Sequence, residues 1–292
     1  MTESRSSASR PATPRELRLR DGRLVALPAV IGVLNVTPDS FSDGGQFLDP
    51  EKALAHALAM EAAGAAIIDV GGESTRPRGA RTVPADEELR RVTPVLELLE
   101  RKLRIPVSID TRKAVVAELA LRHGVAMVND VSALTADAAM GSLVRRSGCG
   151  IILMHMRGGP ENHAKLTLYR DVVSEVRAYL RVRAQLAERS GIKRQRIIVD
   201  PGLGFAKNGD HNLKLLSGLR RICALGYPVA IGASRKRFVR GIAGAGPREM
   251  LAGNAAVNAL AIAHGASLIR VHDTVEAVAA MKIAMAVAGA LG

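Results

Sequence analysis

Aromatic residues are scarce in this sequence. Its 292 residues include four Phe, three Tyr and no Trp. Proteins that bind single-stranded nucleic acid stack the bases on aromatic side chains, so we predict no nucleic-acid binding despite a net charge of +13. Part of that charge lies in residues 177–196, which we interpret as a solvated helix face. Small anionic substrates are another partner class that suits a basic protein.

Cysteine and long apolar runs are also missing. Cys149 and Cys223 lie far apart with no CxxC spacing, which argues against a disulfide framework or a zinc site and favours a reducing cytoplasm. Residues 1–15 have no apolar core for a secretory signal. They are Arg- and Ser-rich like a transit peptide, but we predict a disordered tail. The Ala-rich C-terminus contains Glu276 and Lys282, so no membrane span is expected there.

What the sequence does contain is a repeating unit. From residue 30 onward, short apolar runs alternate with stretches of helical character, as expected for a parallel sheet covered by helices. The runs are 30–36, 66–72, 106–111, 126–131, 150–156, 196–202, 228–234 and 268–273. Their ends lie about 34 residues apart, close to the repeat of an eightfold barrel of about 250 residues.

We therefore predict an α/β protein with a single (β/α)8 TIM barrel domain over residues 16–292. An open doubly wound sheet is the alternative, but no GxGxxG follows the first strand. Residues 16–28 read as a β-hairpin that turns at Asp21-Gly22. Asp49, Pro50 and Glu51 predict the start of a helix, and Gly64 predicts its end.

The carboxyl ends of the predicted strands carry the polar residues, and in such barrels that rim holds the active site. Asp110, Asn129, Asp200 and a lysine, Lys236, suit a flat heterocycle that offers several N–H donors. A second group, predicted to lie opposite, is rich in cations and donors and suits a polyphosphate with a hard metal ion. It comprises Asn35, Thr75, Arg76, Arg270 and His272. Glu73 and His155 also fall on the rim, and His155 has no assigned role.

The same residues form a set of motifs. In order they are VLNVTPDSFSDGG (33–45), GGESTRP (71–77), SIDT (108–111), ND (129–130), DPGLGFAK (200–207), SRK (234–236) and RVHD (270–273). Together they resemble the motifs of dihydropteroate synthases. The resemblance implies a pterin-binding barrel that joins 6-hydroxymethyl-7,8-dihydropterin diphosphate to 4-aminobenzoate in folate biosynthesis, releasing diphosphate and 7,8-dihydropteroate.

The resemblance also implies roles for single residues. Asp110, Asn129, Asp200 and Lys236 would hold the pterin, with Met154 shaping its slot. Asn35 would bind Mg2+, and Arg270 and His272 would hold the diphosphate with Thr75 and Arg76. The residues that would enclose the aminobenzoate are Phe41, Thr75, Pro77, Phe205, Lys236 and Arg237. The family further implies a cytoplasmic homodimer and a target of sulfonamides.

Two rivals share parts of this pattern. A pterin-dependent methyltransferase barrel would share the Asp and Asn side, but it needs no diphosphate site such as GGESTRP and RVHD provide. A catalytically silent homologue would bind pterin without turnover, although every matched residue is present. The sequence also departs from the family at two positions. Arg78 reads as an insertion in the usual STRPG, and Arg237 stands where serine is common.

Overall fold

Eight parallel strands form a nearly closed barrel, which confirms the predicted fold class. The computed structural model describes residues 16–37, 49–73, 82–159 and 165–290. The barrel strands are β3 (Ala29–Asn35), β4 (Ile67–Gly71), β5 (Val107–Asp110), β6 (Met127–Asp130), β7 (Gly150–Met154), β8 (Ile197–Asp200), β9 (Ala230–Ile231) and β10 (Leu268–Val271). They follow the order β8-β7-β6-β5-β4-β3-β10-β9. A parallel bridge between Val199 and Val229 joins the two edges.

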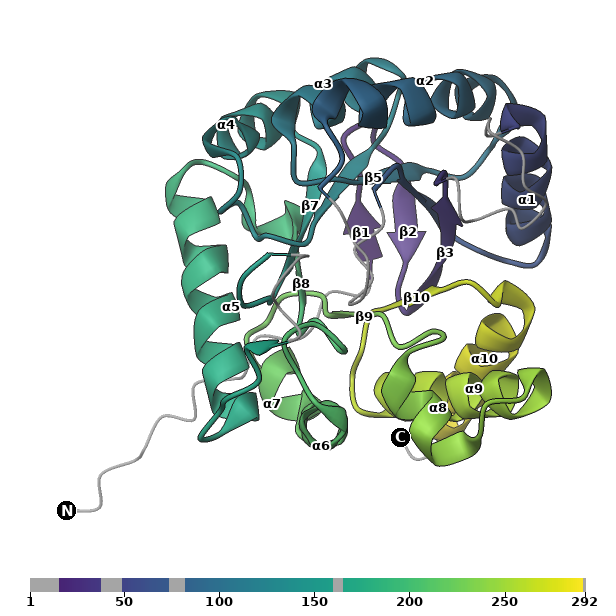
Figure 1. Cartoon of the computed structure of the whole chain (residues 1–292), viewed down its shortest axis with the longest axis vertical. Helices are drawn as coiled ribbons and strands as arrows, with labels where there is room; N and C mark the ends of the chain where they lie inside the picture. Colours follow the sequence, from purple (N-terminus) through teal and green to yellow (C-terminus); the bar gives the residue numbers. More distant parts are fainter. Residues whose placement is uncertain (1–15, 38–48, 74–81, 160–164, 291–292) are drawn as a thin grey trace.

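The helices surround the strands as a ring (Figure 1). They are α1 (Pro50–Ala62), α2 (Ala85–Lys102), α3 (Ala114–Arg122), α4 (Ala138–Ser147), α5 (Val172–Arg189), η3 (Arg194–Arg196, a 3-10 turn), α6 (Gly209–Ser217), α7 (Leu219–Cys223), α8 (Arg237–Ala243), α9 (Pro247–Ala263) and α10 (Thr274–Ala290). Within the described ranges, no helix combines the length and the apolar character that a membrane span requires.

Helix α1 begins where the sequence predicted. The Asp49 side chain accepts hydrogen bonds from the backbone N–H groups of Glu51 and Lys52, at 3.0 and 3.4 Å, and Pro50 is the first helical residue. Both features satisfy or remove N–H groups that a helix start leaves without partners. Gly64 follows the helix end with φ +97°, a conformation that favours glycine.

The predicted hairpin is present, but its turn differs. Strands β1 (Glu16–Arg18) and β2 (Leu24–Ala26) pair antiparallel. The Leu19 N–H donates to the Arg23 carbonyl at 2.9 Å, so the loop contains three residues, 20–22, in place of the predicted two. Gly22, with φ +86°, occupies the left-handed position that such three-residue loops need.

The hairpin closes one end of the barrel. A core cluster without any helix residue joins it to the barrel interior, whereas a second, larger cluster lies between the strands and the helices. The interior cluster contains Leu17, Leu19 and Val25 of the hairpin together with Ile31, Ile67, Ile152, Ile198 and Leu268 of the strands. Apolar packing therefore fills the amino-terminal end of the barrel, and polar side chains are left to the carboxyl ends.

Candidate active site

Strand register brings the predicted pterin residues onto one rim. Gly71 is the pairing partner of both Asn35 and Asp110, and Asp110 pairs in turn with Asn129. On the other side of the barrel Met154 pairs with Asp200. Paired residues on parallel strands lie at the same height, so these side chains meet at the carboxyl end although up to 165 positions separate them in sequence.

At the centre of the rim, Arg270 of β10 bridges two buried carboxylates. Its Nε donates to Asp69 Oδ2 and its Nη2 donates to Asp110 Oδ2, both at 2.6 Å. Asn129 Nδ2 donates to the same Asp69 oxygen at 3.0 Å. Burial raises the pKa of Asp110 to about 7, although Arg270 opposes this shift. Burial works against the charge of Arg270, but Asp69 and Asp110 outweigh it and raise its pKa.

This contact changes the predicted division of the pocket into two sides. The sequence placed Arg270 with the polyphosphate residues, opposite Asp110. In the structure Arg270 touches Asp110 directly, so one guanidinium borders both halves. Among the described residues, Arg270 uses Nε and one N–H of Nη2 in these two bonds, so the other N–H groups of the five that arginine offers can donate to an anion.

Asp69 was not among the predicted site residues, yet this residue organises the centre. It is fully buried and lies in the second apolar run. A usable signal was present, because strand side chains alternate and Asp69 follows the interior residue Ile67 by two positions. A carboxylate on the interior face of an otherwise apolar strand requires a cationic or donor partner.

Asp200 and Lys236 form a second part of the rim. The Gly202 N–H donates to Asp200 Oδ1 at 2.6 Å, and burial raises the pKa of Asp200. Lys236 Nζ donates to the Leu203 carbonyl and lies 4.3 Å from the centre of the Phe205 ring. Burial lowers the pKa of Lys236 to about 8, with Asp200 opposing the shift.

A third group joins Asn35, His272 and Ser234. Asn35 Nδ2 lies 3.3 Å from His272 Nε2, and His272 Nδ1 lies 3.1 Å from Ser234 Oγ. The Ser234 hydroxyl also accepts the backbone N–H of His272 at 3.2 Å. Ser234 belongs to the SRK motif, and no role was predicted for it. Its two contacts fix the orientation of the imidazole that the family resemblance assigns to the diphosphate.

Apolar and exposed residues complete the rim. Met154 is buried in a small cluster with Val131 and Met156, against which Phe205 packs, so it forms a wall of the slot. Arg237 is the first residue of α8 and is exposed. The predicted residues Phe41, Thr75, Arg76 and Pro77, and the inserted Arg78, lie outside the described residues.

Glu73, two residues after β4, takes part in a network of ion pairs. Lys113 donates to both Glu73 and the fully buried Glu88, and Arg112 Nη2 donates to Glu73 Oε1 at 3.1 Å. Both carboxylate oxygens of Glu73 therefore have cationic partners. Such a residue holds the end of β4 in place and is poorly suited to bind a substrate.

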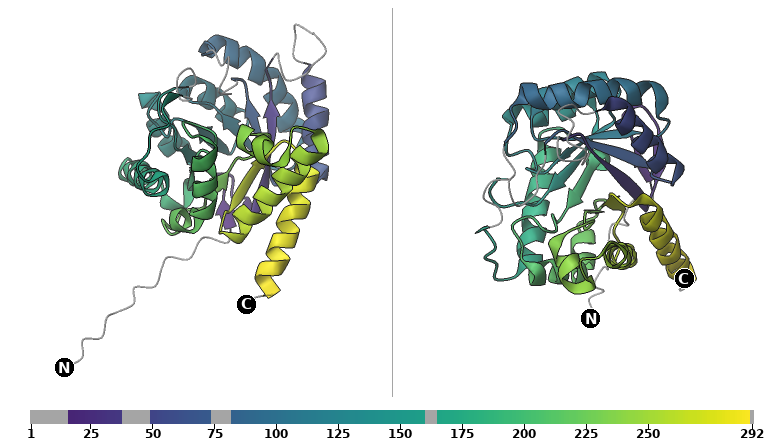
Figure 2. Two further views of the ribbon diagram at one scale, coloured as in Figure 1. Left: turned by 60° about the horizontal axis from the view of Figure 1, so that its bottom comes forward. Right: turned by 45° about the vertical axis from the view of Figure 1, so that its right-hand side comes forward.

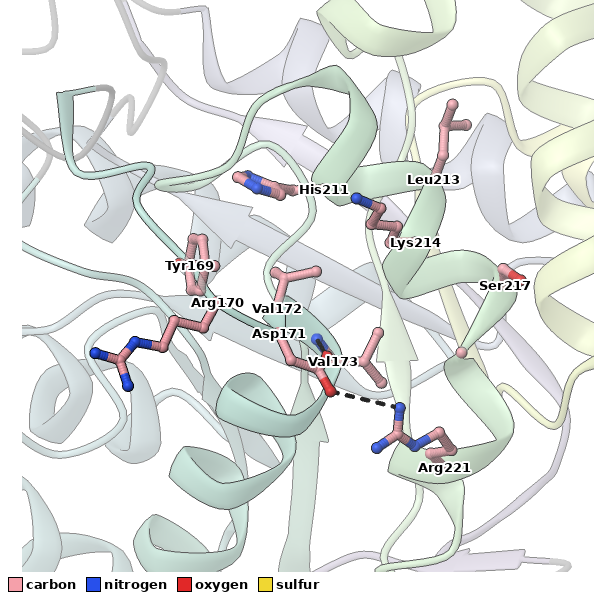
Figure 3. Close-up of a pocket in the computed structure, with 11 residues that line it drawn as sticks. Tyr169, Arg170, Asp171, Val172, Val173, His211, Leu213, Lys214, Ser217 and Arg221 are labelled. Carbon is pink, nitrogen blue, oxygen red and sulfur yellow. Dashed lines mark hydrogen bonds and ion pairs between the residues drawn. The ribbon is translucent and has the colours of Figure 1, made fainter.

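A cavity of about 580 Å³ lies beside the start of α5 and the helices α6 and α7 (Figure 3). Tyr169, His211, Lys214 and Arg221 are among its lining residues, and none of the predicted site residues lines it. Its charged groups are largely paired: Arg221 with Asp171 at 3.9 Å and Lys214 with Asp210 at 2.7 Å. The chemistry at the strand ends, rather than this surface cavity, defines the candidate site.

Comparison with known proteins assigns the family. A model of pterin binding enzymes matches residues 31–272. The chain belongs to the pterin-binding enzyme family. A dihydropteroate synthase of Mycobacterium leprae is 49% identical over 261 residues, which cover 87% of this chain and 91% of that protein. The predicted family and the predicted enzyme class, a transferase, are confirmed.

Solved structures of dihydropteroate synthases also share the fold. One from Xanthomonas albilineans with 4-aminobenzoic acid has a TM-score of 0.87 and 42% identity, with 94% of this chain and 98% of that chain covered. One from Yersinia pestis in complex with a sulfonamide drug has a TM-score of 0.87 and 38% identity, with 94% and 99% covered. These relatives favour the synthase over the methyltransferase alternative.

Proposed function

We propose that this chain joins 6-hydroxymethyl-7,8-dihydropterin diphosphate to 4-aminobenzoate and releases 7,8-dihydropteroate and diphosphate. The observation that carries the proposal is the meeting of Asp110, Asn129, Asp200, Lys236 and Arg270 on one rim. Carboxylates that accept and an amide and cation that donate match the edge of a pterin. His272 and Asn35 lie at the adjoining position, where a diphosphate can reach them.

The reaction breaks the C–O bond between the pterin methylene and the diphosphate, whose oxygen keeps the electron pair. Arg270 and His272 stabilise the charge that develops on the departing anion, and preorganised charge is worth most where water is excluded. Asp110 and Asp200 favour the cation that is delocalised into the pterin ring. The amine nitrogen then attacks the methylene and forms the C–N bond. The resulting ammonium is strongly acidic and gives its proton to the diphosphate or to water, so no dedicated base is needed.

The pocket suits a magnesium ion that arrives with the diphosphate. Within the described part of the chain, no group of three His, Cys, Asp or Glu side chains is placed to hold a metal. Mg2+ takes few protein ligands and completes its shell with water and substrate phosphates. Asn35 would supply its amide oxygen, since its Nδ2 faces His272. When bound, the ion would neutralise negative charge on the diphosphate.

Three further parts of the proposal concern partners and location. The slot bounded by Phe205, Lys236 and the start of α8 would take 4-aminobenzoate and its sulfonamide mimics. A homodimer would form through the apolar surface of α9 and α10. A reducing, cytoplasmic location agrees with Cys149 and Cys223, which are both free thiols.

The direct test is to mix the purified protein with the pterin diphosphate, Mg2+ and labelled 4-aminobenzoate. We expect labelled dihydropteroate, and its absence would refute the proposal and support a silent homologue. Because Arg270 also holds Asp110, His272→Ala is the cleaner probe of the diphosphate side. This variant should lose turnover by about a hundredfold while the affinity for a pterin without diphosphate stays unchanged.

A further inference from the structure

The buried pair His155 and Lys207 has no part in the proposed chemistry. His155 follows β7, Lys207 ends the DPGLGFAK motif, and their side chains are 2% and 7% exposed. Lys207 Nζ lies 2.9 Å from His155 Nδ1. A lysine is almost never buried unless its donors have partners, so this one requires a reason.

The hydrogen bonds of Lys207 connect two loops of the rim. Its Nζ donates to the Phe205 carbonyl at 2.8 Å and to the His155 carbonyl at 3.4 Å. The proton between the two nitrogens can sit on either partner, and in both cases Lys207 keeps two N–H groups for the carbonyls. Burial, with the charges of Lys207 and Arg157, lowers the pKa of His155 to about 2, so the imidazole is neutral.

The segment that Lys207 holds, residues 201–208, packs closely on its surroundings. A Cβ on Gly202 would lie 2.1 Å from the His155 carbonyl oxygen, and one on Gly204 would lie 2.8 Å from Lys236 Cδ. Ala206 adopts φ +51°, an unfavourable conformation for a residue with a side chain. Such a backbone persists only where its surroundings enforce it.

The same segment contacts Lys236 on the proposed aminobenzoate side of the site. The Leu203 carbonyl accepts from Lys236, and the Phe205 ring lies beneath the Lys236 ammonium. At the other end, Gly204 N–H donates to Asn212 Oδ1 at 2.7 Å. Asn212 of α6 and His155, which follows β7, therefore hold the segment through Gly204 and Lys207, and Phe205 lies between these two attachments.

We propose that Lys207 is a positioning residue, which through His155 and the Phe205 carbonyl fixes segment 201–208 and so presents Phe205 and Lys236 to the aminobenzoate. The imidazole of His155, directly after β7, is the fixed partner. This inference rests on the proposed function, because it assumes that Phe205 and Lys236 border the second substrate.

The test compares Lys207→Met with Lys214→Met. Lys214 is an exposed lysine of α6 whose side chain pairs with Asp210 on the same helix. We expect Lys207→Met to raise the KM for 4-aminobenzoate about tenfold, while the affinity for the pterin diphosphate changes less than about threefold. Hydrogen exchange should increase in residues 201–208 and remain unchanged in the other strand-end loops. Lys214→Met should match the wild type in both measurements.

The histidine supplies a second comparison if Lys207→Met fails to fold. His155→Asn keeps a group that can donate or accept near Nδ1, whereas His155→Leu removes it. The asparagine variant should retain the wild-type KM and exchange, and the leucine variant should behave like Lys207→Met. Equal effects on both substrates, unchanged exchange, or equal damage from both histidine variants would overturn the inference. An inactive wild type would refute the proposed function instead, and the exchange data would still judge the role of Lys207.

Discussion

Arg270 is held in place by two carboxylates, and one of them, Asp69, has no proposed contact with a substrate. Asp69 accepts from both Arg270 and Asn129 through one oxygen. An amide oxygen at this position could still accept from both donors, but it would carry no charge to balance that of Arg270. Breaking a buried ion pair at one partner leaves the other charge uncompensated, so Asp69 sets the position of two predicted binding residues at once.

We therefore expect Asp69→Asn to lower kcat/KM by about ten- to a hundredfold and the free energy of unfolding by about 2 kcal/mol. Steady-state kinetics and urea unfolding measure the two quantities. Asp210→Asn, on an exposed carboxylate of α6, is the matched control and should change neither. Full activity in Asp69→Asn would show that Arg270 does not depend on Asp69.

Two buried groups of the rim titrate near neutrality and set the expected pH dependence. Burial raises the pKa of Asp110 to about 7 and lowers that of Lys236 to about 8. Below the first value Asp110 is protonated and no longer accepts two bonds from the pterin. Above the second value Lys236 loses its charge. The kcat/KM for the pterin diphosphate should therefore be bell-shaped, with its maximum between the two values.

Lys236→Arg distinguishes the two limbs, because a guanidinium stays protonated at every accessible pH. This variant should keep the decline on the acid side and lose the decline on the alkaline side. The measurement is kcat/KM from pH 5.5 to 9.5, a range chosen to extend about 1.5 units beyond each pKa. An alkaline decline that persists in Lys236→Arg would assign it to another group.

The rim could be predicted from sequence residue by residue, but its internal contacts could not. Motifs at strand ends identify Asp110, Asn129 and Asp200, because parallel strands end together. The pairing of Arg270 with Asp69 spans 201 positions and depends on the register of β10 against β3 and β4. Nothing local to either residue specifies that register, and therefore the sequence separated Arg270 from the carboxylates that it touches.

At the scale of elements, the β1–β2 hairpin should contribute to the stability of the protein without contributing to its activity. Leu17 is 1% exposed in the interior cluster, whereas Leu24 in the same hairpin is 51% exposed. Both lie at the end of the barrel away from the rim. The Asp21-Gly22 signal identified this hairpin, but the loop length followed from packing of Leu19 against the barrel, which a turn dipeptide does not reveal.

Leu17→Ala should lower the free energy of unfolding by about 2–4 kcal/mol, since it empties a packed site. Leu24→Ala should change it by less than about 0.5 kcal/mol. Neither variant should alter the KM for either substrate in the folded protein. Chemical denaturation and kinetics below the unfolding transition test this pair, and a raised KM in Leu17→Ala would show that the hairpin reaches the site.

At the scale of the whole molecule, helices α9 and α10 expose an apolar surface. Helix α10 lies at the outer edge of the barrel in both views of Figure 2, and only Glu276 and Lys282 are charged among its residues. A helix that is apolar on all sides is normally buried. The large hydrophobic side chains exposed on α9 and α10 are Leu260, Val275, Ile283, Met285 and Val287.

A second copy of the chain would cover this surface and form the proposed homodimer. Stable interfaces bury at least about 1,000 Å², and two neighbouring helices that present apolar side chains can supply such an area.

We expect light scattering to give about twice the chain mass of 30.9 kDa. Ile283→Glu places a charge on this surface and should yield the monomer. Leu168→Glu changes a side chain that is 88% exposed on the segment before α5 and should leave the dimer intact. A monomeric wild type would refute the homodimer. A dimer that survives Ile283→Glu but dissociates in Leu168→Glu would place the contact on another surface.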